Sequence, residues 1–218
     1  YENGKAIEYN VVEVGAIDGY TTETAKIDGT TEENVYTYKI TNTHIPETTS
    51  VKVEKIWDDK KNQDGKRPTS VSITLKAKNA TTVQERTIIL NKDNKWTYTW
   101  SKLDKYEKGT LIDYIVVEND VKEGYTSTST VTKSESGYKY TVKNSYTPET
   151  TSVTINKEWD DNDNQDGKRP DSIKVKLLAN GKEVENGTET ITPDDNGKWT
   201  YTWTNLYKYK NGKKISYT

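Results

Sequence analysis

The feature of this sequence that most constrains its fold is an internal repeat about one hundred residues long. The segment WDDKKNQDGKRPTSVSITLKA begins at Trp57 and returns as WDDNDNQDGKRPDSIKVKLLA from Trp159, a shift of 159 − 57 = 102. YKITNTHIPETTSV returns as YTVKNSYTPETTSV at the same shift, which carries Asn42 to Asn144. Self-similarity at a fixed period is typical of tandem structural units, so each copy should fold with its own core.

The motif PETTS marks the boundaries of this repeat. Residues 48–149 form a complete copy, residues 1–47 look like the C-terminal half of a copy, and residues 150–218 look like the N-terminal half. YENGKAIEY and YKNGKKISY overlap where the halves are cut. This overlap favours a window on a longer array over a domain deliberately divided between molecules. The absence of any Met also indicates a piece of a longer protein.

Composition excludes several classes of function. Lys and Arg number 32 against 34 Asp and Glu, and no basic block occurs, so nucleic acid is not an expected partner. No apolar run approaches the roughly 20 residues that cross a bilayer, so no membrane insertion is expected in this segment. Cysteine is absent and His44 is the single histidine, which leaves no thiol chemistry and no expected metal or cofactor. His44 is interpreted as a solvated linker residue.

Short alternating segments separated by turn signals predict an all-β fold. Alternation is clear in VSITLKA, WTYTW, YIVVE and YKYTVKN, and no segment shows an extended helical period. About seven strands in a hundred residues, with no helix to cover a sheet face, predict tandem immunoglobulin-like β-sandwich domains. The predicted core consists of Val51, Val53, Ile73, Leu75, Trp96, Trp100, Tyr114, Val116, Tyr140 and Val142.

Three polar residues share a strand face with these apolar positions. Lys55 is in phase with Val51 and Val53, Glu118 with Tyr114 and Val116, and Asn144 with Tyr140 and Val142. The partial copies repeat the pattern with Glu13 and Asn42 in the first half and Lys157 in the last. A buried ammonium is costly unless it is paired or neutralised, so the recurring set needs a chemical explanation.

Lysine, glutamate and asparagine together can form an amide bond. Burial lowers the pKa of a lysine and raises that of a carboxylic acid, so a proton can pass from the amine to the acid. The uncharged amine can then attack the Asn carboxamide, polarised by the acid, and ammonia leaves. Strands that hold the groups together supply a high effective molarity.

The sequence resembles the collagen-adhesin B-type (Cna_B) domain family of Gram-positive surface proteins. The motifs that carry this resemblance are VEKIWDD, NQDGKRP, KWTYTW, YIVVE and YTVKNSYTP. The resemblance covers essentially the whole chain. It implies stalk or spacer domains of a cell-wall-anchored, extracellular adhesin on a bacterial surface, many of which carry an autocatalytic Lys–Asn isopeptide bond assisted by Glu. No collagen-binding region of the kind that gives the family its name is visible.

Carried over by motif, the resemblance implies a bond between Lys55 and Asn144 with Glu118 as catalyst. Lys157 would belong to a copy whose Glu and Asn lie beyond Thr218, and Glu13 and Asn42 to one whose Lys precedes Tyr1. Neighbouring repeats of the parent are the expected partners. A further hypothesis is head-to-tail association, in which Lys157 of one molecule meets Glu13 and Asn42 of the next.

Other interpretations remain open at the level of sequence. The three polar residues could be ordinary strand residues or a noncovalent buried ion pair, which stabilises weakly because desolvation offsets attraction. The repeat could itself bind a host matrix protein or glycan through an exposed patch. Asn162–Gly167 resembles the start of a calcium loop but lacks its final ligand, since Ile173 stands at that position. No nucleophile–base constellation indicates a conventional enzyme beyond single-turnover bond formation.

Overall fold

The computed structural model describes residues 1–5, 7–27, 35–135 and 137–218. Over these ranges every regular element is a β-strand, as predicted. None of the described segments is a helix with the length and hydrophobicity to cross a membrane. The chain separates into two compact units, Tyr1–Thr49 with Ser101–Ile112 and Ser50–Trp100 with Asp113–Thr218. The repeat boundaries at residues 47/48 and 149/150 stay a prediction.

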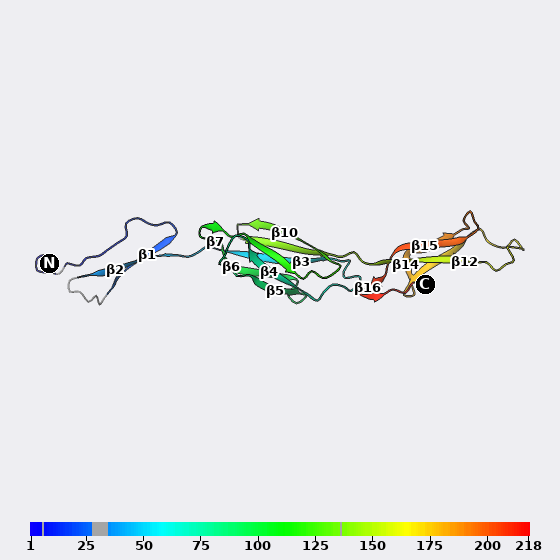
Figure 1. Ribbon diagram of the computed structural model, residues 1–218, viewed down its shortest axis with the longest axis horizontal. Coiled ribbons are helices and arrows are strands. Elements are labelled where there is room, and N and C mark those ends of the chain that lie inside the picture. The colour runs from blue at the N-terminus through cyan, green and yellow to red at the C-terminus, as the bar shows by residue number, and fades with distance from the viewer. Residues whose placement is uncertain (6, 28–34, 136) are drawn as a thin grey trace. The chain divides into compact units, whose positions relative to one another are not determined.

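Two sheets build the middle of the chain (Figure 1). The first has the order β10–β11–β3–β6, and the second has the order β5–β4–β9. Their bounds are β3 (Thr48–Asp58), β4 (Ser70–Ala77), β5 (Arg86–Asn91), β6 (Thr97–Asp104), β9 (Tyr114–Asn119), β10 (Thr126–Ser134) and β11 (Gly137–Ser145). Four strands in one sheet and three in the other give the seven-strand, immunoglobulin-like sandwich that the sequence predicted.

The strands β3 and β11 run parallel and side by side, although they are the first and last strands of the sandwich. Lys55 lies opposite Val142, and Asn144 lies opposite Trp57. Because side chains two apart point to the same face, Lys55 and Asn144 are diagonal neighbours on one surface of the sheet. The strand β9 pairs with β4 in the other sheet, where Glu118 lies opposite Ile73.

The apolar faces of the two sheets form the core. Nine of the ten predicted core residues are buried, and Val71, Leu90, Tyr125 and Tyr138 join them. Trp96 is the exception, because it lies in the turn before β6 with a left-handed φ of 59° and is only half-buried. The inward alternation expected for WTYTW is therefore wrong at this end, and Tyr98 is 42% exposed.

The first unit contains two separate strand pairs. The strands β1 (Tyr20–Ile27) and β2 (Thr37–His44) pair antiparallel with Tyr20 opposite His44. The short strands β7 (Tyr106–Glu107) and β8 (Thr110–Leu111) form a tight hairpin. His44 is thus the last residue of a strand rather than a linker residue, although it is exposed as expected.

Residues 150–218 form three antiparallel strand pairs. These are β12 (Thr150–Lys157) with β15 (Trp199–Tyr207), β13 (Ile173–Ala179) with β14 (Lys182–Ile191), and β16 (Tyr209–Lys210) with β17 (Lys213–Lys214). Leu177, Ile191, Trp199 and Trp203 are buried here. These residues therefore build part of the apolar core that the complete copy has.

Candidate functional site

The structure brings Lys55, Glu118 and Asn144 together between the two sheets. Lys55 Nζ lies 3.2 Å from Glu118 Oε2, and Asn144 Nδ2 donates a hydrogen bond of 2.8 Å to Glu118 Oε1. The two side chains of the ion pair are 0% and 3% exposed, and Asn144 is completely buried. Glu118 therefore stands between the amine and the carboxamide, as the phase of the three strands predicted.

The site is dry enough to lower the pKa of the lysine. Burial lowers the pKa of Lys55, and the charge and hydrogen bond of Glu118 oppose that shift only in part. The ammonium also lies 4.8 Å from the centre of the Trp57 ring, which closes this side of the site with apolar surface. An amine held in this way loses its proton more readily than a lysine in water.

One acceptor in the site is unsatisfied. Asn144 Oδ1 is buried and has no hydrogen-bond partner among the residues that the structure describes. A buried oxygen without a donor costs free energy, so such an atom calls for an explanation. Rotating the carboxamide by half a turn would exchange Oδ1 and Nδ2, and Oδ1 would then face the Glu118 carboxyl group.

A hydroxyl group that the sequence interpretation missed completes the surroundings of Glu118. Ser127 Oγ, on β10, donates a 2.6 Å hydrogen bond to Glu118 Oε2. The first partial copy has Thr22 at the matching position of its GYTTET motif. In both copies a hydroxyl residue follows a glycine by three positions, Thr22 after Gly19 and Ser127 after Gly124. This recurrence could have indicated the contact, but Ser and Thr are too common in strands for it to be recognised.

The first partial copy keeps the second half of the same arrangement. Asn42 Nδ2 donates to Glu13 Oε1 at 3.3 Å, and Thr22 Oγ1 lies 2.7 Å from Asn42 Oδ1. Asn42 is exposed, in contrast to Asn144. The pairing of acid and amide therefore forms without the lysine strand, but the site does not become dry without it.

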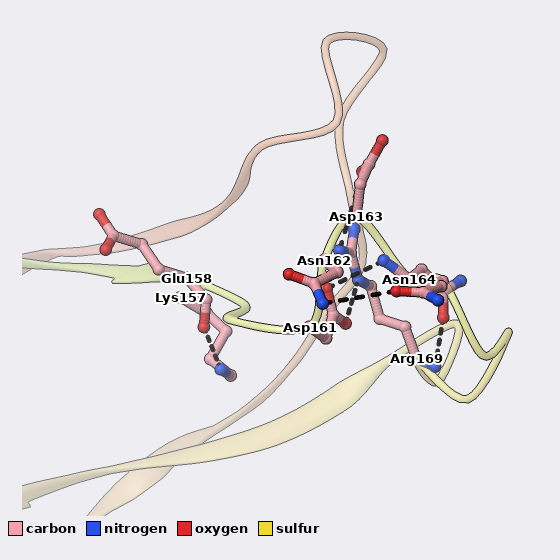
Figure 2. A network of polar contacts seen from close by, with 8 residues as sticks. Lys157, Glu158, Asp161, Asn162, Asp163, Asn164 and Arg169 are labelled. Atoms are coloured by element: carbon pink, nitrogen blue, oxygen red, sulfur yellow. Dashed lines mark hydrogen bonds and ion pairs between the residues drawn. The ribbon is translucent and has the colours of Figure 1, made fainter.

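Lys157 occupies the same motif position as Lys55 in the last partial copy, without an acid partner from its own copy. Its Nζ contacts the backbone carbonyl of Glu158 (Figure 2). The same Nζ lies 4.1 Å from the Trp159 ring centre. The structure thus assembles one complete set of the predicted residues, Lys55, Glu118 and Asn144.

A second buried polar cluster lies next to the site. Asp59 is 1% exposed, and its carboxylate accepts hydrogen bonds from the Arg67 guanidinium at 2.5 and 2.8 Å and from Tyr125 Oη at 3.0 Å. Burial opposes ionisation of Asp59, but the bonds from Arg67, the Asn62 backbone and Tyr125 outweigh it and lower its pKa. This cluster fastens the loop after β3 to the sandwich.

The matching loop of the last copy has the same internal bonds (Figure 2). Asp161 is bound by Arg169 at 2.5 Å, and this interaction lowers the pKa of Asp161 to about 2. Its carboxylate therefore already has a cationic partner from the chain. The residues described by the structure include no group of three or more His, Cys, Asp or Glu side chains arranged to hold a metal ion.

Fold and site together define the class of this protein: a repeat protein with an immunoglobulin-like β-sandwich, in which a buried Lys–Glu–Asn set connects the first and last strands of the complete sandwich. The sequence matches the Cna protein B-type domain family over residues 51–147 and 153–218. The chain belongs to this family.

Two similar proteins extend this assignment. The chain is 46% identical over all 218 of its residues to a collagen adhesin of Staphylococcus aureus, and it spans 17% of the length of that protein. The crystal structure of two B repeat units of the collagen-binding protein of S. aureus matches the whole chain with a TM-score of 0.69 and 44% identity. The match covers 53% of that crystallised chain.

Proposed function

We propose that this chain is a structural stalk segment of a bacterial surface adhesin, in which the complete repeat is locked by an amide bond between Lys55 and Asn144. The observation that carries the proposal is the buried contact of Lys55 and Asn144 with the two oxygens of Glu118. The relatives support an adhesin, since they are repeats of a collagen adhesin. An extracellular, cell-wall-anchored location follows from the same relationship and is part of the proposal.

The chemistry begins with a proton transfer from Lys55 Nζ to Glu118 over their 3.2 Å contact. Neutral Nζ then attacks Cγ of Asn144 while protonated Glu118, with the carboxamide rotated, donates to Oδ1. The new Nζ–Cγ bond forms, the Cγ–Nδ2 bond breaks, and Nδ2 leaves as ammonia with a proton relayed by Glu118 from the attacking amine. Of the three protons on the Lys55 ammonium, one stays on the new amide nitrogen, one is relayed to Nδ2 and one remains on Glu118, which ends protonated. The reaction is a single autocatalytic turnover, and the chain is not a conventional enzyme.

The mass of the intact chain tests this bond. Loss of ammonia lowers the mass by about 17 Da from the sequence value. Lys55→Ala should restore the full mass, whereas the matched variant Lys157→Ala should keep the deficit because Lys157 has no acid partner in its own copy. A wild-type chain at full mass after prolonged incubation would overturn the covalent proposal.

The partial copies extend the proposal to association between molecules. Lys157 of one chain would join Glu13 and Asn42 of the next, which completes the set that each half lacks. Boiling in detergent should then leave covalent ladders in the wild type and a single monomer band for Lys157→Ala. A monomer band for both chains would contradict the association between molecules but would not bear on the proposed Lys55–Asn144 bond.

A host-binding repeat is the alternative function. It would need an exposed patch that recognises a matrix protein or glycan, and Tyr98, which is 42% exposed and packs edge-on against Trp100, is one exposed aromatic of the sandwich. A spacer should bind none of a panel of matrix proteins and glycans, so saturable binding of the full chain to one of them would favour the alternative.

A further inference from the structure

The indole ring of Trp57 contacts two cations of the complete copy. Lys55 Nζ lies 4.8 Å from the ring centre, and the guanidinium carbon of Arg67 lies 5.4 Å from it. The Lys55 side chain is completely buried, whereas the Arg67 side chain is 26% exposed. Trp57 itself is half-buried. The ring therefore lies at the border between the dry site and the loop after β3.

No hydrogen bond from its own side chain fixes the Trp57 ring. Its Nε1 is buried and has no hydrogen-bond partner among the described residues. The ring is held instead by Arg67 and by edge-on contacts with Trp96 and Tyr125, whose ring centres lie 5.2 and 5.4 Å away. Asp59 Oδ2 accepts hydrogen bonds from both Arg67 and Tyr125. Asp59 thus fastens two of the groups that hold the ring.

The loop between Asp59 and Arg67 adopts a costly backbone conformation. Residues 60–62 have left-handed φ of 51°, 60° and 62°, and Gln63 N donates to Asp59 O at 3.2 Å. Three consecutive left-handed residues without glycine are unfavourable, because each Cβ comes close to the following carbonyl oxygen. Strain of this kind persists where other contacts determine the conformation, and it is concentrated at functional sites. Here the turn brings Arg67 to both the Asp59 carboxylate and the Trp57 ring.

The last copy repeats this arrangement. Residues 162–164 have φ of 47°, 55° and 59°, and Arg169 bonds to Asp161 (Figure 2). The Arg169 guanidinium carbon lies 5.8 Å from the Trp159 ring centre, and Lys157 Nζ lies 4.1 Å from it. The arrangement of lysine, tryptophan, acid and arginine therefore forms in both copies from the sequence between the lysine and the arginine.

We propose that Arg67 is a positioning residue for the reaction of Lys55, because it holds the Trp57 ring as a lid that keeps water from the amine. This inference rests on the bond formation proposed above and adds the residues that keep the site dry. Burial is the largest influence on the Lys55 pKa and lowers it. The ring also favours the ammonium through its π electrons, but at a buried lysine this contact is weaker than desolvation.

Other groups near Lys55 come from β9, β10, β11, the residue before β10 and the loop after β3. They are Glu118, Ser127, Asn144, Tyr125, Asp59 and Arg67. Glu118 contacts the ammonium, and the charge of Arg67 is balanced by Asp59. A variant that removes the lid without changing the net charge therefore separates water exclusion from electrostatic attraction.

The titration of Lys55 tests the lid in a chain that cannot form the bond. Asn144→Ala leaves the amine free, and NMR of the full chain labelled with ¹³C-lysine follows the charge of Nζ through the adjacent Cε signal. Adding Trp57→Leu leaves every charge in place. Loss of cover should then raise the Lys55 pKa, whereas loss of the cation–π contact alone would lower it. An unchanged or lower pKa would overturn the proposal.

A charge-balanced double variant tests the role of Arg67. Asp59→Asn with Arg67→Gln removes one acid and one base, so a higher Lys55 pKa in the Asn144→Ala chain reports that the ring no longer covers the amine. The matched control is Asp161→Asn with Arg169→Gln, which removes the same ion pair from the last copy and should leave the titration unchanged. Identical Lys55 titrations for the two double variants would overturn the positioning role.

The rate of bond formation connects the lid to the proposed function. Chain purified in urea is refolded with Asn144 intact, and the loss of about 17 Da is followed over a range of pH. The rate should depend on pH as a bell, because Lys55 and Glu118 must together hold one transferable proton. Asp59→Asn with Arg67→Gln should lower the maximum at least about tenfold and move the alkaline limb to higher pH.

The shape of this pH profile separates positioning from a loss of folded chain. Fewer folded molecules would lower the rate at every pH without moving the alkaline limb, and that result would contradict the positioning role. A wild-type chain that stays at full mass would contradict bond formation itself. The Lys55 titration would still decide whether Trp57 and Arg67 keep the amine dry.

Discussion

Lys55 and Lys157 show how the same residue type can have different surroundings at matching positions of the repeat. Lys55 and Lys157 both precede a tryptophan by two positions, and both lie over its ring. Only Lys55 has an acid within reach and a buried side chain, because β9 and β11 are present to cover it. The reactivity of the residue therefore depends on the strands around it.

Ser127 should control the rate of bond formation rather than the fold. Its hydroxyl orients Glu118, so Ser127→Ala should slow the loss of ammonia at least about tenfold. The time course of intact mass after refolding measures this rate. Ser129→Ala, at an exposed position on the same strand, should leave the rate unchanged, and equal rates for both variants would exclude a positioning role for Ser127.

Asp59 should make the stability of the complete copy sensitive to acid. Its folded-state pKa lies below the unfolded value of about 3.9, so its contribution is present above that pH and is lost as pH falls through the folded-state value. Asp59→Asn should cost about 2 kcal/mol at neutral pH, and less at lower pH. Urea unfolding at pH 7 and pH 3 measures this difference.

Asp93→Asn, in the exposed turn before β6, is the control for Asp59. It should cost little at either pH. If both variants lowered the free energy of unfolding by the same small amount at pH 7, the Asp59–Arg67–Tyr125 cluster would not stabilise the loop after β3 as we expect.

At the scale of elements, the parallel pair β3–β11 determines when Lys55 and Asn144 can meet. Antiparallel neighbours can be joined by a short turn, whereas a first and a last strand meet only when everything between them has folded. Their contact therefore brings Lys55 and Asn144 together only in the completed domain. The proposed bond would therefore form after folding and not before it.

Gly137 permits this contact at the start of β11. Its φ is 142°, and a Cβ there would lie 2.1 Å from the carbonyl oxygen of Ser50 on β3. Gly137→Ala should therefore separate the ends of the two strands and destabilise the complete copy by about 3 kcal/mol, as judged from thermal or urea unfolding.

Gly109→Ala separates backbone strain from steric clash. Gly109 also has a positive φ, but a Cβ there would have open space, so the change should cost only about 1 kcal/mol. Equal losses for the two variants would mean that close approach to Ser50 is not what requires Gly137.

At the scale of the whole molecule, the proposed bond changes how the chain responds to force. A bond between Lys55 and Asn144 carries tension directly from the first strand to the last, and it shields the 144 − 55 = 89 residues of chain that it bypasses. Without the bond, unfolding would release about 300 Å of chain, at about 3.4 Å per residue.

Force spectroscopy on the full chain measures this release. Lys55→Ala should show an extension step of about 300 Å that the wild type and Lys157→Ala lack. The same step in the wild type would show that the complete copy is not locked.

Much of this molecule could be predicted because its signals are local. Alternation of apolar residues identified the strands, and the phase of Lys55, Glu118 and Asn144 with that alternation placed all three inside. The prediction that Trp96 lies in the core was wrong because its left-handed backbone conformation interrupts the alternation. A two-residue period in the sequence does not reveal such a turn. The Ser127 and Asp59 contacts were missed because they join separate strands and loops through common residue types.

The sequence by itself determined the repeat, the all-β class and the polar residues that share a face with the core, since period and phase are properties of neighbouring positions along the chain. Only the tertiary structure decided which of those residues meet. Lys55, Glu118 and Asn144 come from three strands in two sheets, and the dry environment that lowers the lysine pKa exists only where both sheets are complete.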